Sequence, residues 1–415
     1  MEPDLPLRGP RGVLYITYDG LLDPLGGSQI LPYVRGIAAH PRRVHVLSFE
    51  KPERFIAAGG ELAQGLEQTG IGWTALQFTR GRLGKVWDLG RMCVLALVLS
   101  FKHGLRIVHC RGHVPVQVGA LVKLFTGARL IFDFRGLWAD ERVDKGSWNL
   151  SKPFDKAVYA ISKCLERALL RYSDQVVVLT KAIKPHLVAL GASVDKITVI
   201  PCCADFDHFK LPSDAQRLES RVRLGLPLTG TVLGYLGSIG RMYMTELSLA
   251  AVESAIENGA ASGFLCITPD IELMKGMLEE RQWSARGIQA VVLQGHRDEI
   301  PGLLAAMDVL VAFFLPTPAR VGTSPTKIAE CFAQGLPLIT NTGVGDGAAL
   351  LAQVSGGLLV DLDDPAAVGD AWRHLDAILA AGGHRLRDAA RPVLGLEHAN
   401  AQYREVYGRL EGTQC

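Results

Sequence analysis

Short runs rich in Val, Ile and Leu alternate with stretches of helical periodicity along nearly all 415 residues of this chain, which restricts the folds open to it. Such runs are typical of parallel strands buried on both faces, with helices as the covering layers. We therefore predict an α/β protein built on parallel sheets. The predicted strands are residues 13–18, 44–48, 73–78, 106–110, 130–134, 175–179, 197–201, 231–236, 263–268, 288–294, 308–313, 336–341 and 357–361.

The strand pattern lapses once, in a polar stretch at residues 204–227, which we interpret as a linker. A chain of 415 residues is also too long for one ordinary hydrophobic core. We predict two doubly wound domains, residues 1–204 and 205–395, followed by a terminal segment, residues 396–415. This segment carries Tyr403, Val406 and Tyr407 near helical spacing, so it is predicted to be an amphipathic helix.

Composition argues against several classes of protein. With 44 basic and 42 acidic residues the net charge is +2, so no overall field attracts nucleic acid. Residues 1–12 lack the apolar core of a secretion signal, and the longest apolar run, residues 92–101, is about half of the ~20 residues that span a bilayer. The eight cysteines show no CxxC spacing, which is typical of reduced thiols. We expect a cytoplasmic protein with no metal site.

The segment from Ser324 to Thr326 predicts an anion site. Apolar residues at helical spacing follow it, and Gly335 and Pro337 end the helix before a buried strand. The free N–H groups and the positive dipole end at the start of such a helix bind phosphate without a metal. Glu330, about one and a half turns further along, is placed to accept hydrogen bonds from a sugar hydroxyl. An ordinary helix cap is the alternative interpretation.

This stretch resembles the donor-binding motif of the retaining family 4 glycosyltransferases of the GT-B fold, most closely that of the bacterial polysaccharide members. The segment Gly234-Tyr235-Leu236-Gly237-Ser238-Ile239-Gly240-Arg241 is similar to the first strand and loop of the family's second domain. The resemblance implies two Rossmann-like domains with a cleft between them, the first on the acceptor side and the second binding the nucleotide sugar donor. It implies as well that the terminal helix returns to the first domain. It also implies a nucleotide diphosphate sugar as donor, a saccharide or polyprenyl-linked acceptor, and no cofactor.

The resemblance further implies roles for individual residues. Arg241, Lys327 and Arg135 are the implied catalytic cations, and Arg135 stands near the point where relatives often carry a donor-contacting His. The implied donor-binding residues are Gly26, Gly27, Ser28, Gly237, Ser238, Ser324, Pro325, Thr326 and Glu330. The implied acceptor-binding residues are Asp19, Asp140 and Glu141. A structural ion network is the alternative for Asp133, Arg135, Asp140 and Glu141, which follow the fifth predicted strand.

Three details of the pattern carry separate expectations. The Lys that usually follows Arg241 is missing, and Lys327 and Arg320 are the nearest replacements. Gly322 stands where the family carries the first of two glutamates, which weakens any inference about the sugar more than the inference that a nucleotide binds. The pair Gly26 and Gly27 is expected to form a loop before a helix, where the backbone approaches a ligand closely; a tight turn is the alternative.

We therefore predict a metal-independent retaining glycosyltransferase that acts in cell-surface polysaccharide synthesis. A nucleotide-sugar epimerase of the same fold and a non-catalytic subunit are the alternatives. The apolar helix predicted at residues 85–101 is flanked by Arg80, Arg82, Arg91 and Lys102. This pattern predicts a peripheral contact with the inner face of the plasma membrane, and a core helix of the first domain is the alternative.

Overall fold

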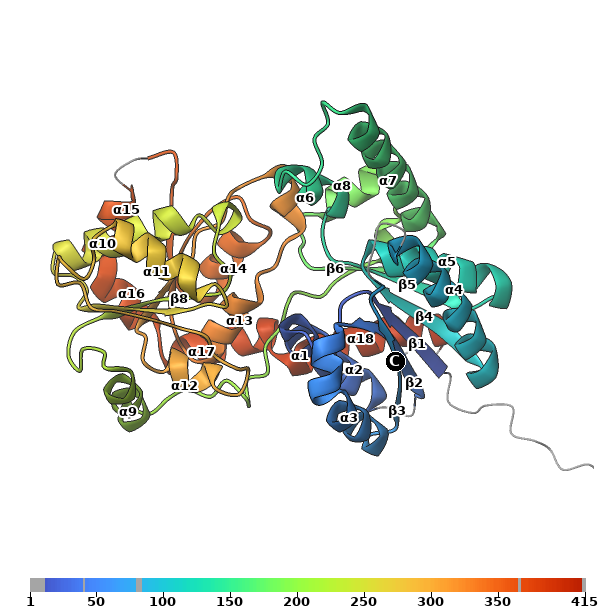
Figure 1. The fold of residues 1–415 in the computed structure, drawn as a ribbon, viewed down its shortest axis with the longest axis horizontal. Helices are drawn as coiled ribbons and strands as arrows, with labels where there is room; N and C mark the ends of the chain where they lie inside the picture. The colour runs from blue at the N-terminus through green and yellow to red at the C-terminus, as the bar shows by residue number, and fades with distance from the viewer. Residues whose placement is uncertain (1–11, 40–41, 80–83, 365–366, 413–415) are drawn as a thin grey trace, which may run out of the picture. The chain divides into compact units, whose positions relative to one another are not determined.

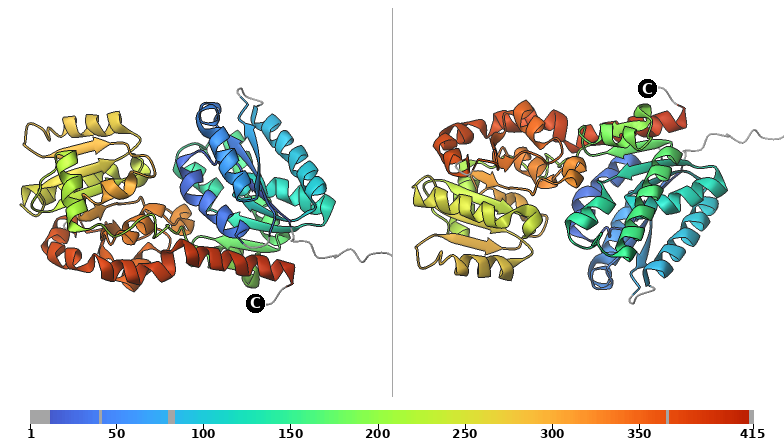
Figure 2. Two further views of the ribbon diagram at one scale, coloured as in Figure 1. Left: turned by 90° about the horizontal axis from the view of Figure 1, so that it is seen from below. Right: turned by 90° about the horizontal axis from the view of Figure 1, so that it is seen from above.

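The computed structural model describes residues 12–39, 42–79, 84–364 and 367–412. Contacts divide the chain into two compact units, one of Met1–Pro201 with Ala399–Cys415 and one of Cys202–His398. Each unit is a parallel sheet covered by helices (Figures 1 and 2). Arg80 and Arg82, which flank the predicted apolar helix, lie outside the described residues.

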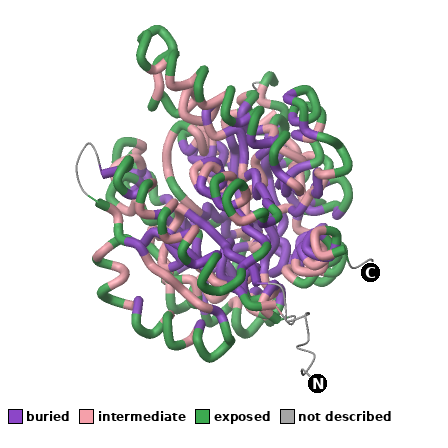
Figure 3. The backbone as a smooth tube through the Cα atoms, turned by 90° about the vertical axis from the view of Figure 1, so that its right-hand side faces the viewer, coloured by how far each residue is buried: buried purple, intermediate pink, exposed green. Residues whose placement is uncertain are grey.

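The first unit holds a seven-stranded parallel sheet in the order β3-β2-β1-β4-β5-β6-β7. Its strands are β1 (Gly12–Thr17), β2 (Val44–Glu50), β3 (Ile71–Gln77), β4 (Leu105–Arg111), β5 (Arg129–Phe134), β6 (Gln175–Val178) and β7 (Ile197–Val199). Strand β1 is buried along its whole length, and β4 and β5 are buried except for Arg106 and Arg129 near their starts. Figure 3 shows the buried backbone in purple. The strand order reverses between β1 and β4, and ligands of doubly wound sheets bind at the carboxyl ends of the strands at such a point.

Helices cover both faces of this sheet. Three of them, α4 (Gly84–His103), α5 (His113–Thr126) and α7 (Pro153–Tyr172), pack side by side. The others are α1 (Pro24–Gln29), α2 (Leu31–Ala38), α3 (Pro52–Gln68), α6 (Trp138–Asp144), α8 (Lys184–Ala189), η1 (Val194–Lys196) and α18 (Leu396–Glu411). The predicted terminal helix is confirmed as α18, which buries Tyr403 against Tyr33. The Tyr407 hydroxyl and His109 Nδ1 share a hydrogen bond of 2.7 Å.

The second unit holds a six-stranded parallel sheet in the order β10-β9-β8-β11-β12-β13. Its strands are β8 (Val232–Leu236), β9 (Gly263–Ile267), β10 (Ala290–Leu293), β11 (Val309–Val311), β12 (Leu338–Asn341) and β13 (Gly357–Val360). One apolar cluster joins the sheet to α13 (Thr326–Ala333), α14 (Gly347–Val354) and α17 (His384–Leu394). A second cluster joins its other face to α10 (Thr245–Glu257), α11 (Ile271–Glu280) and α16 (Leu375–Ala381). The shorter helices are α9 (Asp214–Leu224), η2 (Arg241–Tyr243), α12 (Ile300–Leu304), η3 (Pro318–Gly322), α15 (Ala367–Asp370) and η4 (Ala371–His374).

The predicted fold class is confirmed, because every predicted strand overlaps a parallel strand of one of the two sheets. Two local predictions are wrong. The stretch predicted as a linker contains helix α9, whose start is a capping box of Ser213 and Gln216. The stretch predicted as a Gly-Gly loop is helix α1, where Gly26 is needed because a Cβ would lie 2.2 Å from the Gly20 carbonyl oxygen.

Candidate functional site

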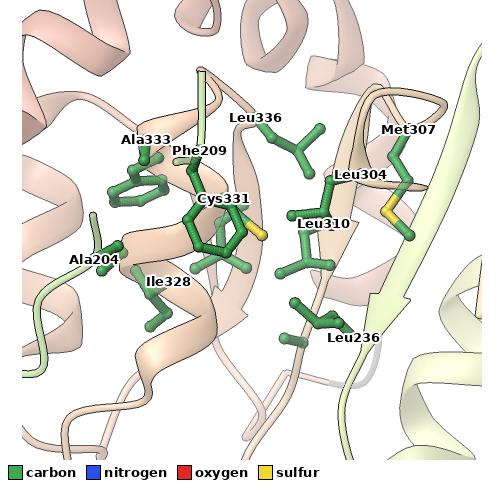
Figure 4. Packing of buried hydrophobic residues seen from close by; sticks show 14 of the residues in the cluster. Ala204, Phe209, Leu236, Leu304, Met307, Leu310, Ile328, Cys331, Ala333 and Leu336 are labelled. Atoms are coloured by element: carbon green, nitrogen blue, oxygen red, sulfur yellow. The ribbon is translucent and has the colours of Figure 1, made fainter. Parts of the chain in front are cut away.

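Helix α13 is fixed in the core of the second unit. Ile328, Cys331 and Ala333 are buried in the cluster that Leu236 of β8 and Leu310 of β11 share (Figure 4). Gly335 has a φ of +68° just beyond the helix, a conformation that favours glycine, and the chain then enters β12. The apolar face of α13 therefore holds the helix against the sheet. The first turn of α13, which follows η3 in the chain, thereby keeps a fixed position.

The first turn of α13 leaves backbone donors available to a ligand. No side chain caps the helix, since its N-cap residue is Pro325. By helix geometry the first N–H groups, those of Thr326 and Lys327, have no acceptor within the helix. The Ser324 hydroxyl oxygen accepts a hydrogen bond of 3.2 Å from the backbone N–H of Cys202, which anchors the approach to the helix. The predicted residues Ser324, Pro325 and Thr326 thus form an ordered mouth that can receive an anion.

Lys327 places its ammonium group inside an aromatic cage. Its Nζ lies 5.3 Å from the ring centres of Tyr235 and Tyr243 and 5.5 Å from that of Phe314. Burial lowers the pKa of Lys327 from 10.5 to about 8, although nearby Cys331, Cys266 and Glu330 oppose the shift. The ring faces favour the charged form, so the cage holds a cation at a defined point.

The loop after β8 meets this ammonium group. A Cβ built on Gly237 would lie 2.8 Å from Lys327 Nζ, and Gly237 has a φ of +118°. Glycine is therefore required there both for conformation and for space. The Tyr235 hydroxyl donates to the Ser238 carbonyl oxygen at 2.7 Å, which fixes the loop. Sequence positions 237–238 and 327, predicted separately, are thus neighbours at the point where the strand order reverses between β8 and β11.

Two arginines of the second unit differ in their freedom. Arg320 in η3 is buried, donates weakly to the Met242 carbonyl oxygen at 3.4 Å, and lies 5.8 Å from the ring centre of Tyr243. Its Nε has no hydrogen-bond partner among the described residues. Arg241 in η2 is exposed, and within the described chain its side chain makes no hydrogen bond or ion pair. Arg241 is therefore free to reach a ligand, whereas Arg320 and Lys327 form a preorganised positive region around Tyr243.

Glu330 lies one turn beyond Lys327 on the same helix. Burial raises the pKa of the Glu330 carboxyl group, and the charges of Arg297 and Lys327 offset only part of that rise. The side chain is half-buried and accepts no hydrogen bond from the described residues. A partly desolvated carboxylate with free lone pairs is well suited to a pair of hydroxyl donors.

A cavity of about 690 Å³ opens beside Arg241 in the second unit. Ile239, Met244, Leu247 and Met277 give it an apolar wall, and Glu246, Glu272 and Glu280 also line it. Lys327 and Glu330 do not. The structure therefore brings Gly237, Lys327 and Glu330 together, and it places Arg241 in the lining of a cavity that Lys327 and Glu330 do not line.

In the first unit, predicted residues gather after β1 and β5. Arg111 donates to Asp19 at 2.7 Å, and Arg135 lies 3.4 Å from Asp133 and donates to Gln29 at 2.8 Å. Burial raises the pKa of Asp133, but Arg135, His109 and Arg111 outweigh it and lower that pKa to about 2. Asp133 therefore stays ionised and fixes the Arg135 guanidinium group.

The other predicted residues of this unit are engaged within it. Asp140 accepts from Tyr159 at 2.7 Å and from Lys163 at 2.8 Å, and Lys163 also pairs with buried Glu166. Glu141 pairs with Lys145 at 3.0 Å. In α1, the Ser28 hydroxyl donates to the Pro24 carbonyl oxygen at 2.9 Å. The Gly27 N–H donates to the Asp23 carbonyl oxygen. The acceptor roles of Asp19, Asp140 and Glu141 stay predictions.

Some site residues were not foreseen from the sequence. Tyr235, Tyr243 and Phe314 form the cage, and aromatic residues at such distant positions carry no local signal for it. Arg320 was named only as a replacement for the missing Lys. Among the residues that the structure describes, no group of three or more His, Cys, Asp or Glu is placed to hold a metal ion. No helix of the described segments has the length and apolarity to cross a membrane.

Two protein-family models match the chain. The Glycosyl transferase 4-like domain matches residues 26–203, and the Glycosyl transferases group 1 model matches residues 230–376. The first match includes strands β2 to β7 of the seven-stranded sheet, and the second includes all strands of the six-stranded sheet.

Two sequence relatives match part of the chain. D-inositol 3-phosphate glycosyltransferase of Corynebacterium kroppenstedtii is 26% identical over 205 residues, which are 48% of this chain and 42% of that protein. UDP-Gal:alpha-D-GlcNAc-diphosphoundecaprenol alpha-1,3-galactosyltransferase of Escherichia coli is 29% identical over 173 residues, which are 41% of this chain and 42% of that protein. The chain therefore spans less than half the length of the curated relatives it matches.

Solved structures match the fold over nearly the whole chain. Anabaena HepE in complex with UDP and glucose is 15% identical, with a TM-score of 0.67 over 95% of this chain and 99% of that chain. A glycosyltransferase from Rickettsia africae is 14% identical, with a TM-score of 0.72 over 98% of this chain and 100% of that chain. At these identities the likeness concerns the fold.

Proposed function

Because the chain belongs to the GT-B glycosyltransferases of the family 4 type, we propose that it transfers a sugar from a nucleotide diphosphate sugar to a saccharide or lipid-linked saccharide, with retention of configuration. The observation that carries this proposal is the group formed by Lys327, Gly237 and Glu330 at the start of α13. It combines the backbone donors of the first turn, a caged cation and a carboxylate that accepts no hydrogen bond from the described residues. Such a set matches a diphosphate followed by a ribose.

We propose uridine diphosphate as the carrier of the sugar. The relative from Escherichia coli is named for UDP-Gal, and Anabaena HepE was solved with UDP. The acceptor of that relative is a diphosphoundecaprenol-linked saccharide, which supports a lipid-linked acceptor and a part in cell-surface polysaccharide synthesis. The relative from Corynebacterium kroppenstedtii is named for D-inositol 3-phosphate instead.

In the proposed reaction the bond between the anomeric carbon and the diphosphate oxygen breaks while the acceptor oxygen bonds to the same face of that carbon. The proton of the acceptor hydroxyl passes to the departing diphosphate. The α13 N–H groups, Lys327 and Arg241 stabilise the negative charge that develops on the diphosphate, so the reaction needs no metal and no carboxylate nucleophile. Arg320 adds positive potential because it is fixed beside the same Tyr243 ring. In this proposal Arg135, whose guanidinium group is held by Asp133 and Gln29, is a further catalytic cation.

We further propose that the protein works in the cytoplasm as a peripheral protein at the inner face of the plasma membrane. A polyprenyl-linked acceptor stays in the bilayer, so an enzyme that uses it must approach the lipid surface. Exposed apolar residues along α4 support this proposal, including Trp87 and Phe101.

The proposal is tested by incubating the purified protein with a set of UDP-sugars, with and without a diphosphate-lipid-linked saccharide, and measuring UDP and product. Release of UDP that depends on the acceptor supports transfer. Isomerised UDP-sugar without acceptor indicates an epimerase, and binding without turnover indicates a non-catalytic subunit. Lys327→Met serves as the matched inactive variant, and Lys275→Met, at an exposed site on α11, serves as the control.

A further inference from the structure

We infer that the outward face of α4, α5 and α7 in the first unit docks on an anionic lipid bilayer. This inference deepens the peripheral location proposed above by naming the surface and the lipid. It rests on the proposed function in one respect only, namely that docking would bring a lipid-linked acceptor close to the protein. Its evidence is the distribution of apolar and basic side chains over three adjacent helices, whose residues the structure describes in full.

Each of the three helices exposes large apolar side chains. These are Val86, Trp87, Val94, Val98 and Phe101 on α4, Leu121, Leu124 and Phe125 on α5, and Phe154, Ile161, Leu165 and Tyr172 on α7. Phe101 is 66% exposed and Phe154 is 76% exposed. Scattered single residues of this kind are ordinary on a protein surface, whereas a set that covers three neighbouring helices marks an interaction site.

The spacing shows that these residues form stripes. Trp87, Val94, Val98 and Phe101 recur at intervals of seven, four and three, which places them on one face of α4. Phe154, Ile161, Leu165 and Tyr172 recur in the same manner along α7. The core uses other faces of these helices, since Met92 and Ala96 of α4 and Leu169 and Leu170 of α7 are buried.

The helices are joined at one end of the surface. Lys123 of α5 donates to the Tyr172 carbonyl oxygen at 2.8 Å, and its Nζ lies 4.6 Å from the ring centre of Tyr172. Contacts also join α4 to α5 and α5 to α7. The stripes therefore belong to one continuous layer, which we call the α4–α5–α7 face.

The charges on this layer select a negatively charged partner. Lys85, Lys102, Lys156, Arg167 and Arg171 are exposed. The carboxylates of the same helices are turned inward or paired: Asp88 binds Thr79, Asp155 accepts from the Asn149 N–H, and Glu166 is buried against His113 and Lys163. Apolar stripes with a one-signed basic border are suited to the interface of an anionic membrane, where rings and alkyl chains enter the headgroup region.

The test uses the full chain and vesicles of phosphatidylcholine with about 30% phosphatidylglycerol, against vesicles of phosphatidylcholine alone. We expect flotation with the anionic vesicles at about 50 mM salt and much weaker flotation at about 500 mM. The apolar variant V94S/F101S/I161S/L165S is expected to abolish binding. The charge variant K102Q/K156Q/R167Q is expected to weaken partition by about 100-fold, since each near-surface cation contributes about five-fold.

The matched control is Ile56→Ser on α3, which is 83% exposed but belongs to a helix outside this face. It is expected to bind vesicles as the wild type does. Bromine-labelled acyl chains are expected to quench tryptophan emission in the wild type, and Trp87→Phe is expected to remove most of that quenching. Binding of UDP, measured by thermal shift without lipid, is expected to be unchanged in all these variants, so a failure of docking is distinguishable from a failure of the proposed function.

Several results would overturn the inference: no flotation with anionic vesicles at low salt, equal flotation with neutral vesicles, or equal flotation of the apolar variant and the wild type. Light scattering in solution tests the alternative that a second copy of the chain binds this face. A dimer that the apolar variant dissociates would assign this face to a second copy of the chain instead.

Discussion

Replacing Lys327 by Met removes a caged ammonium group while keeping the length and the apolar stem of the side chain. The pKa of Lys327 in the folded protein is about 8, which is about 2.5 below its usual 10.5 and corresponds to about 3 kcal/mol. Below pH 8 both the folded and the unfolded chain carry the charge, so the whole cost of burying it is present. Between pH 8 and 10.5 only the unfolded chain binds this proton, so the free energy of unfolding rises with pH.

The expected gain in stability is smaller than that full cost. The side chain retains some exposure, and Met gives up the attraction of the charge to three aromatic rings. We expect Lys327→Met to raise the free energy of unfolding at pH 7 by about 1 to 3 kcal/mol, and to lack the rise between pH 8 and 10.5. Urea unfolding monitored by circular dichroism measures both effects.

The same substitution is expected to weaken UDP binding. A charge-assisted hydrogen bond to phosphate contributes about 1.5 to 3 kcal/mol, so the dissociation constant should rise about 10- to 150-fold at pH 7. In the wild type, UDP affinity should fall about tenfold per pH unit above pH 8, because the free protein loses the proton that the complex keeps. Calorimetry in two buffers of different ionisation enthalpy should show proton uptake on binding at pH 9.

Lys275→Met is the matched control, since Lys275 is an exposed lysine on α11 that pairs with Glu272. It should leave UDP affinity unchanged and alter stability by less than about 0.5 kcal/mol. The reasoning would be refuted if Lys327→Met destabilised the protein and bound UDP as tightly as the wild type does. Lys327 would then be a structural residue.

Three further substitutions separate the other roles. Glu330→Ala should weaken binding of UDP, with a smaller loss for Glu330→Gln, but should change binding of 2'-deoxy-UDP little; equal losses for both nucleotides in calorimetry would make Glu330 a structural helix residue. Arg241→Ala should lower kcat/KM by about 30- to 150-fold (2 to 3 kcal/mol) without changing the thermal midpoint, and an unchanged rate would leave the diphosphate to Lys327 and Arg320. Asp308→Ala should destabilise the protein by about 3 to 5 kcal/mol in urea unfolding, because Asp308 pairs with Arg217 and with buried Arg221, and a loss under about 1 kcal/mol would contradict that account.

The strands were predictable because each is a short apolar run between polar or glycine-containing stretches, and burial on both faces of a parallel sheet requires such a run. Helix α9 was missed because its surroundings are polar. The local signal, Ser213 followed by Gln216 three residues later, was present and is the pattern of a capping box.

The site was predictable in part. Ser324 to Glu330 carry a local pattern, so their grouping on α13 follows from helical spacing alone. The cage around Lys327 draws on β8, η2 and the segment after β11, and only the folded sheet brings those segments together. Gly26 shows the opposite error, since two glycines suggested a ligand loop, whereas close packing against the chain's own backbone requires Gly26.

The stripe on α7 escaped prediction for another reason. Apolar periodicity indicates a face to be buried, and α7 has apolar residues on both its core side and its outward side. Spacing cannot tell which of two such faces the fold covers, and only the packed structure shows that Phe154, Ile161 and Leu165 stay exposed.

The most direct test of the central claim is the stereochemistry of the product formed from an α-linked UDP-sugar and a diphosphate-lipid-linked saccharide. Nuclear magnetic resonance of the new glycosidic linkage measures the coupling constant at the anomeric proton. The account predicts an α-linked product that forms only when acceptor is present and that Lys327→Met largely abolishes. A β-linked product, or isomerised UDP-sugar formed without acceptor, would contradict it.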